Sequence, residues 1–404
     1  MALERSFIMR TKMGRFLVST IVLAVTAFAS AGEFSGNVSL EGRYYSSDPA
    51  FEKQQKSGGL AISIHPEYKH KWDNDNQAFT FSPFYRWDEN DDERTHGDIR
   101  QLDYVVAKDN WEFQAGLGQV YWGVTESQHL VDIVNQTDAV EGVDGEDKLG
   151  QPMFRVSYLT DNGSLDLYVL PYFRERTFAG INGRFRAPLV VDTDAASYES
   201  ADEEKHIDYA LRWTETMDDF DFGFHIFDGT SRDPVFKTGI KNGAPVLTPH
   251  YPLITQFGID LQHTGESTLW KLETIHREAE DSFTAAVGGF ERTLPAFESG
   301  SELGLLAEYH KDSRGEVAAA PFQNDLFLGA RYTLNDEADS QLLAGAFVDL
   351  DNATKSLRVE ASRRIGKGLK INLEGQVFTD VDKNDPTQVF SKDDFIQLEL
   401  QKFF

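Results

Sequence analysis

The sequence predicts an all-β fold: a closed antiparallel transmembrane β-barrel of about 16–18 strands, with short periplasmic turns and long extracellular loops. Three observations predict it. The chain begins with an export signal, no later segment is apolar enough for a spanning helix, and its segments alternate apolar and polar residues up to Phe404. Because lipid cannot satisfy open backbone groups, a membrane protein without spanning helices must close its strands into a barrel. The alternative is a soluble periplasmic β protein.

The start of the chain has the composition of a secretory signal peptide. Basic residues lie within positions 10–15, residues 16–28 are mostly apolar, and residues 29–31 (Ala-Ser-Ala) match a small-x-small cleavage site. The apolar run is shorter than the roughly 20 residues of a membrane-spanning helix. We therefore expect a signal peptide at 1–31 and a single outer-membrane β-barrel at 32–404.

Composition excludes several kinds of partner and site. Without residues 1–31 the 39 basic and 66 acidic side chains become 35 and 65, so the net charge changes from −27 to −30. Such a surface repels nucleic acid and suits divalent cations that bridge it to lipopolysaccharide. The chain has no cysteine, which excludes disulfides and Cys-ligated metals. The acidic loops lack an ordered ligand repeat such as an EF-hand, so we expect no metal and no cofactor.

The predicted strands follow from period-two alternation. In the last strand Ile396, Leu398 and Leu400 share one face, and Gln397 and Glu399 share the other. Several apolar faces end in Trp, Tyr or Phe, as the interfacial girdles of membrane barrels do. The predicted strand starts are Glu33, Gly58, Gln77, Asp98, Trp111, Pro152, Ser164, His206, Asp219, Pro252, Thr268, Ser282, Glu302, Asn324, Ser340, Ser356, Leu369 and Asp394. Without the split at Ser282, a barrel of about 16 strands is the alternative.

The connections alternate between short and long. Tight turns such as 73–75 and 366–368 are rich in Asp, Asn and Gly, whereas roughly 121–150, 174–204 and 230–250 are far longer than ordinary loops. This rhythm is typical of short periplasmic turns and long extracellular loops. Pro66, Pro83 and Pro171 remove backbone donors within strands, so we expect bulges or strand ends there.

The inward strand faces carry charges of both signs, which predicts an interior that is wet or mutually paired. Such charges can form a cross-strand ladder that stabilises the barrel, or a polarised constriction that sorts solutes. The expected lining residues are Arg86, Arg155, Asp208, Arg212, Glu308, Arg331, Arg358, Glu360, Arg364, Lys370 and Glu374.

The segment 121–138 is the candidate constriction, and a plain extracellular loop is its alternative. Gly118 and Gly123 permit tight turns, and Tyr121 and Trp122 supply apolar anchors. We expect the segment to fold into the lumen opposite basic wall residues; if two of its acids, Asp132 and Asp138, face them, the lumen carries a transverse field there. Those expected basic residues are Arg155, Arg212, Arg331 and Arg364. Arginines at the narrowest point would favour anions locally.

The same segment carries a family resemblance. The residues Gly118, Gln119, Trp122, Gly123, Asp132, Asn135 and Asp138 follow a G-R-Q-x-x-x-W-G-E…D-x-I-N-P-x-D pattern. The chain thereby resembles uncharacterised Gram-negative outer-membrane porin-like proteins, which are distantly similar to alginate-export porins. Val124 and Gln136 stand where the family has Glu and Pro. The resemblance implies a porin-like barrel and passive transport.

The predicted function is a passive channel in the cell outer membrane for small hydrophilic solutes, because barrels of this size leave an aqueous lumen. A structural or receptor barrel whose loops bind another protein or lipid is the alternative. An outer-membrane hydrolase is disfavoured, and no enzyme is expected, since the chain lacks a G-x-S-x-G elbow, an H-E-x-x-H helix and a Walker loop. Expected partners are outer-membrane lipid and lipopolysaccharide, a small solute, and the barrel-assembly machinery through the C-terminal strand.

Overall fold

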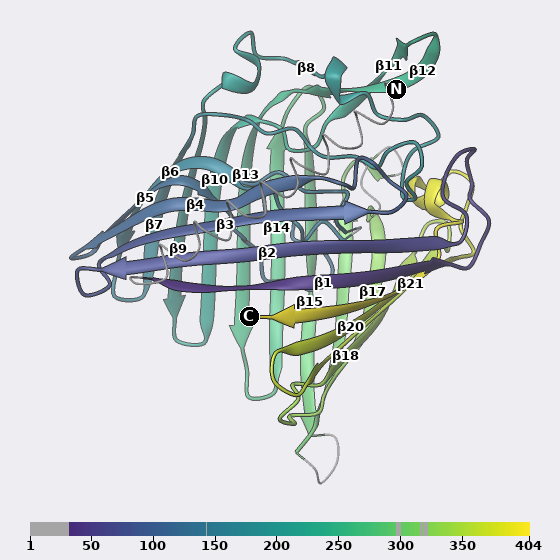
Figure 1. Cartoon of the computed structure of the whole chain (residues 1–404). Helices are drawn as coiled ribbons and strands as arrows, with labels where there is room; N and C mark the ends of the chain where they lie inside the picture. The colour runs from purple at the N-terminus through teal and green to yellow at the C-terminus, as the bar shows by residue number, and fades with distance from the viewer. Residues whose placement is uncertain (1–31, 143, 296–299, 316–317, 319–321) are drawn as a thin grey trace, which may run out of the picture.

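The computed structural model describes residues 32–142, 144–295, 300–315, 318 and 322–404. Eighteen strands form one sheet, and β1 (Glu33–Tyr45) pairs antiparallel with β21 (Phe395–Phe403), which closes the sheet into a barrel (Figure 1). The predicted closed antiparallel barrel is therefore confirmed. The predicted signal peptide, 1–31, lies outside the described residues. Among the described residues no helix is long and apolar enough to cross a membrane.

Each barrel strand pairs antiparallel with the barrel strands that precede and follow it, the small sheet of the long loops being left out of this order. All strand starts lie within two residues of the predicted positions, including the division after Glu278. The remaining barrel strands are β2 (Gly58–Trp72), β3 (Gln77–Asp88), β4 (Gly97–Lys108), β5 (Trp111–Gly118), β6 (Gln151–Leu159), β7 (Gly163–Leu170), β9 (Asp208–Met217), β10 (Phe220–Thr230), β13 (Leu253–Thr264), β14 (Thr268–Glu278), β15 (Phe283–Pro295), β16 (Glu302–Asp312), β17 (Asn324–Thr333), β18 (Gln341–Asp349), β19 (Lys355–Ile365) and β20 (Leu369–Thr379).

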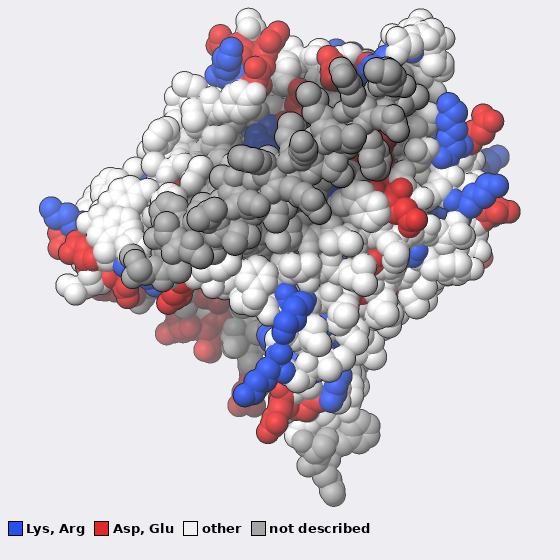
Figure 2. All heavy atoms as spheres, in the orientation of Figure 1, with Lys and Arg blue, Asp and Glu red and all other residues white. Residues whose placement is uncertain are grey.

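The barrel is apolar on the outside, and most of its inward side chains are polar. Along β21, Ile396, Leu398 and Leu400 are exposed, while Gln397 and Glu399 between them turn inward and are half-buried. Successive side chains of a strand point to opposite faces, so alternation in sequence becomes separation between the outer surface and the lumen. Figure 2 shows the consequence on one face: the visible strand surfaces are largely uncharged, and charged side chains gather toward the margins. This arrangement reverses the inside-apolar rule of a soluble sandwich.

The two ends of the barrel differ, as the sequence predicted. At one end, here the short-turn end, residues with positive φ such as Asp73, Asn74 and Gly366 reverse the chain within a few residues. Asn, Asp and Gly tolerate this backbone region better than other residues do. The long connections lie at the opposite end, here the long-loop end. Pro83 lies at a register shift between β3 and β4, and Pro171 directly follows β7.

One element at the long-loop end was not predicted. Residues 230–250, expected as a loop, contain the hairpin of β11 (Val235–Lys241) and β12 (Ala244–Tyr251), which pairs with β8 (Ser197–Tyr198) in a separate sheet (Figure 1). Its turn is Asn242-Gly243, with φ of 52° and 80°, a sequence that favours tight hairpin turns. Short 3-10 helices at the same end are η1 (Thr193–Ala195), η2 (Glu203–Lys205) and η4 (Pro386–Phe390).

Candidate constriction site

The connection between β5 and β6, described over residues 119–142 and 144–150, lies inside the barrel. Its apolar centre, Val131, Ile133 and Val134, is 0–1% exposed. These side chains pack with Trp122 against inward residues of β6, β7, β9, β10, β13, β14 and β15. Such burial excludes water from this side of the lumen, so the segment, here the lumen loop, is a packed structural element. A plain extracellular loop would leave these residues exposed.

The first polar anchor of the lumen loop is Glu273 on β14. Its Oε1 accepts hydrogen bonds from the amides of Val124 (2.7 Å) and Thr125 (2.9 Å) and from the Thr125 hydroxyl (2.7 Å). Its Oε2 accepts one from the amide of Val131 (3.2 Å). Glu273 is 0% exposed, so these donors satisfy a carboxylate that would otherwise be costly to bury.

A second anchor is Glu308 on β16, which accepts hydrogen bonds from the amides of Glu126 (2.8 Å) and Ser127 (2.9 Å). The Ser127 hydroxyl contacts both Glu308 and Nε2 of His310, the latter at 2.8 Å. This Ser–His contact differs from a nucleophile–base pair, because the acid contacts the serine, while Nδ1 of His310 lies 3.3 Å from the side-chain oxygen Oε1 of Gln128. We interpret it as an anchor of the loop.

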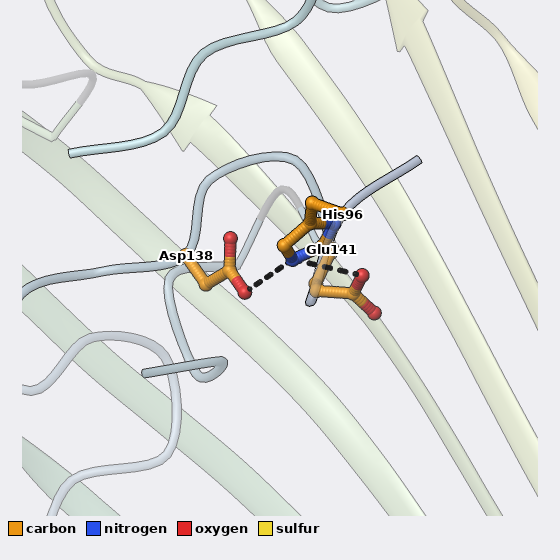
Figure 3. Close-up of side chains that lie close together, drawn as sticks. All are labelled: His96, Asp138 and Glu141. Carbon is orange, nitrogen blue, oxygen red and sulfur yellow. Dashed lines mark hydrogen bonds and ion pairs between the residues drawn. The ribbon is translucent and has the colours of Figure 1, made fainter. Parts of the chain in front are cut away.

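The third anchor joins the lumen loop to the residues before and within β4 (Figure 3). His96 Nε2 lies 2.9 Å from an Asp138 oxygen and 3.7 Å from a Glu141 oxygen. Asp138 also accepts a hydrogen bond from Arg100 (2.5 Å), and Glu141 pairs with Arg86 of β3 (2.7 Å). Three atoms that could bind a metal ion, one each from His96, Asp138 and Glu141, lie within 4.8 Å of one another. Because two guanidinium groups neutralise the two carboxylates, we interpret this cluster as an ion-paired latch.

Electrostatics hold this latch in its charged form. Burial alone would raise the pKa of Asp138, but the hydrogen bond from His96 and the charge of Arg100 lower it to about 2. Burial opposes the charged form of His96 as well, yet the hydrogen bond and the charge of Asp138 raise the pKa of the imidazole above its usual value. Each partner therefore stabilises the ionised form of the other.

Two further contacts carry the lumen loop across to the other side of the barrel. Glu126 pairs with Arg331 on β17, which also pairs with Glu291 at 3.2 Å. Asp144 pairs with Arg358 on β19. The segment thus contacts β4, β14, β16 and β19 from the inside of the barrel.

The acids proposed from the sequence do not pair with the arginines that were proposed as their partners. Asp132 pairs with Lys148 of the same loop at 2.7 Å, and Asp138 pairs with Arg100 and His96. Neither faces the four arginines named for that role. The predicted pairing of Asp132 and Asp138 with those arginines is wrong because nearer basic residues, in the loop itself and on β4, take both carboxylates.

The predicted arginines have separate positions. Arg155 pairs with Glu112 on neighbouring β5, and Arg212 pairs with Asp260 at 2.8 Å and lies over the Trp122 ring. Arg364 lies two residues before the turn at Gly366, 53% exposed and 3.8 Å from Asp339, so it belongs to the short-turn end. Of the four, Arg331 forms an ion pair with the lumen loop, and Arg212 contacts that loop through the Trp122 ring.

The other proposed residues lie along the lumen. Tyr121 of the lumen loop is 56% exposed, whereas Trp122 is 6% exposed and packs on Tyr168. Glu360 and Glu374 lie directly opposite each other on β19 and β20, and both pair with Arg358.

Sequence reasoning missed His96, Arg100 and Glu273 as anchors. Arg100 and Glu273 lie at inward positions of strands β4 and β14, which the alternation could have identified. Nothing in the sequence pairs Glu273 with Thr125, which stands 148 positions away.

No protein-family model and no curated protein matches the chain. Solved structures do match. OccK11 (OpdR) of Pseudomonas aeruginosa is 9% identical with a TM-score of 0.53, over 92% of this chain and 95% of that one. OccD3 (OpdP) of the same organism is 10% identical with a TM-score of 0.52, over 93% and 91%. A BenF-like porin from Pseudomonas fluorescens Pf-5 is 9% identical with a TM-score of 0.54, over 92% and 98%. At these identities the likeness shows that the chain shares their barrel fold.

Proposed function

We propose that this protein is a porin-like passive channel of the cell outer membrane for small hydrophilic solutes. One observation carries the proposal: the lumen loop crosses the inside of a closed barrel and is held there by charged side chains. A barrel of this size without such a loop would leave a wide lumen. A loop that packs against one side and reaches the other by ion pairs narrows that lumen and leaves its remaining lining charged and hydrated.

The surroundings of the barrel are proposed on the same basis. The exposed apolar outer face suits lipid, the short-turn end suits the periplasm, and the acidic long-loop end suits lipopolysaccharide through bridging divalent cations. Export by residues 1–31 and recognition of the C-terminal strand by the barrel-assembly machinery complete this proposal. The finer assignment, to porin-like proteins distantly similar to alginate-export porins, rests on the motif within residues 118–138.

A receptor or structural role is the second candidate, and the hairpin of β11 and β12 favours it. Ile240 near the tip of this hairpin is 80% exposed, and Val235 and Phe236 on the same strand are also exposed. An apolar tip at the long-loop end could contact another macromolecule. A barrel with this role alone would not need to conduct solutes, so transport measurements separate the two candidates.

Solute entry into proteoliposomes tests the proposal, with neutral sugars of graded size as probes. We expect the smallest sugars to enter and larger ones to be excluded progressively. Because the chain has no cysteine, Tyr121→Cys provides a single reactive thiol in the lumen. A charged thiol reagent should slow sugar entry through Tyr121→Cys and leave Leu398→Cys, on the outer face, unchanged. Vesicles that contain folded protein and admit no sugar would contradict the proposed function.

A further inference from the structure

Most basic side chains along the lumen loop and the wall near it are bonded to one or two acids. Arg100 bonds to Asp138 and Asp98, Arg86 to Glu141 and Glu41, and Lys148 to Asp132. Elsewhere on the wall Arg155 and Arg212 each have one carboxylate partner. These pairs are close to neutral, so they contribute little net field to a passing ion.

Arg358 differs because three carboxylates share it. It pairs with Asp144 from the lumen loop, with Glu360 of its own strand at 2.5 Å, and with Glu374 of β20 at 3.9 Å. Glu360 and Glu374 are directly opposite each other in the strand register, an arrangement that repels without a cation between them. The four side chains are 21–42% exposed, so lumen water reaches them.

Two further acids follow Asp144 in the lumen loop. Asp147 has no ion pair with a described residue, and Glu146 lies 3.4 Å from His129. Enclosure by the barrel and the nearby carboxylates of Glu141 and Asp144 raise the pKa of Asp147 to about 7, so this acid is only partly ionised at neutral pH. The negative charge of this part of the lumen comes from Asp144, Glu360 and Glu374, which outnumber the one guanidinium of Arg358.

We infer that Arg358 determines the charge selectivity of this channel. The space between the lumen loop and β19, here the gap, is bridged by Arg358 and prefers small cations over anions. The inference rests on the proposed channel function and identifies the solute class of the same site. It reverses the anion preference expected from arginines alone, because one guanidinium here serves three carboxylates. Arg358 also ties the loop to the wall, so it limits the width of the gap as well as its charge.

Reversal potentials in a KCl gradient across planar bilayers test the inference. We expect the wild-type protein to pass K⁺ in preference to Cl⁻. Arg358→Gln should raise the ratio of K⁺ to Cl⁻ permeability roughly twofold or more, because a unit charge several ångströms away in water shifts the energy of an ion by about RT. It should also raise conductance, since the tie to Asp144 is lost. The double variant Glu360→Gln/Glu374→Gln should bring the permeability ratio toward one.

Arg155→Gln is the matched control. It removes the same charge from the lumen wall, but its partner Glu112 is on β5 and not on the lumen loop. A wild-type preference for Cl⁻, or an Arg358→Gln reversal potential no different from that of Arg155→Gln, would overturn the inference. Absence of any wild-type conductance would instead contradict the proposed function, so the two failures are distinguishable.

Discussion

Replacement of Glu273 by alanine should release the lumen loop. The carboxylate accepts four hydrogen bonds, from the amides of Val124, Thr125 and Val131 and from one hydroxyl. A hydrogen bond to a charged group contributes about 1.5–3 kcal/mol, but the contributions of one cluster are not additive, so we expect a loss of about 3–6 kcal/mol in loop docking. Glu273→Gln should cost less, because three of the four donors use one oxygen, which an amide oxygen can replace.

Hydrogen exchange of the Val124, Thr125 and Val131 amides measures this loss directly. Since each 1.4 kcal/mol is tenfold, exchange in Glu273→Ala should accelerate by roughly two to four orders of magnitude. Conductance should rise and become noisier as the loop leaves the lumen. Glu278→Ala, an exposed acid on the same strand, is the control. If the three amides keep their wild-type exchange rates in a folded Glu273→Ala barrel, Glu273 is not the anchor that its contacts indicate.

Two further predictions concern the outer face and the latch. Leu398→Arg should destabilise the barrel by about 2–4 kcal/mol if the side chain faces the middle of the bilayer, whereas Gln397→Arg, which faces the lumen, should cost much less; urea unfolding in lipid vesicles compares them. The low pKa of Asp138 stabilises the latch at pH values above about 3.9, the pKa of an unfolded Asp. This stabilisation is lost as pH falls through about 2, the pKa of Asp138 in the folded protein. The raised pKa of His96 contributes stability below its unfolded value of about 6.5 that is lost as pH rises through the folded pKa. Protease protection of residues 138–141 should therefore be greatest between about pH 4 and 6.5, and His96→Gln should remove the decline on the alkaline side.

The strands could be predicted from the sequence because the bilayer imposes a simple rule. Lipid requires an apolar residue at every second position of a strand, and the lumen accepts polar residues between them. The outward position of Leu398 and the inward position of Gln397 can therefore be predicted from residue type alone. The hairpin of β11 and β12 lies beyond the lipid, so the alternation that lipid imposes does not apply to it. It was not predicted, although Asn242-Gly243 is a strong signal for a hairpin turn.

The site could be predicted only in part, because its contacts join residues far apart in the chain. The inward course of the lumen loop followed from its glycines, its aromatic residues and its length. The partners of its acids did not, since Asp138 meets Arg100 and Asp144 meets Arg358, 38 and 214 positions away. The position of a residue relative to a turn can be used to predict its depth in the barrel. Arg364 precedes Gly366 by two residues, and because a strand rises about 3.3 Å per residue, Arg364 must lie near the end of the barrel.

Single-channel recording of the full-length wild-type protein in planar bilayers tests the central claim most directly, namely that a loop inside the barrel narrows a water-filled lumen without closing it. The account predicts discrete, stable conductance steps on insertion, and larger, less stable steps when Glu273→Ala releases the loop. Insertion of the wild-type protein with no conductance, and no gain in Glu273→Ala, would contradict it and favour a receptor or structural barrel.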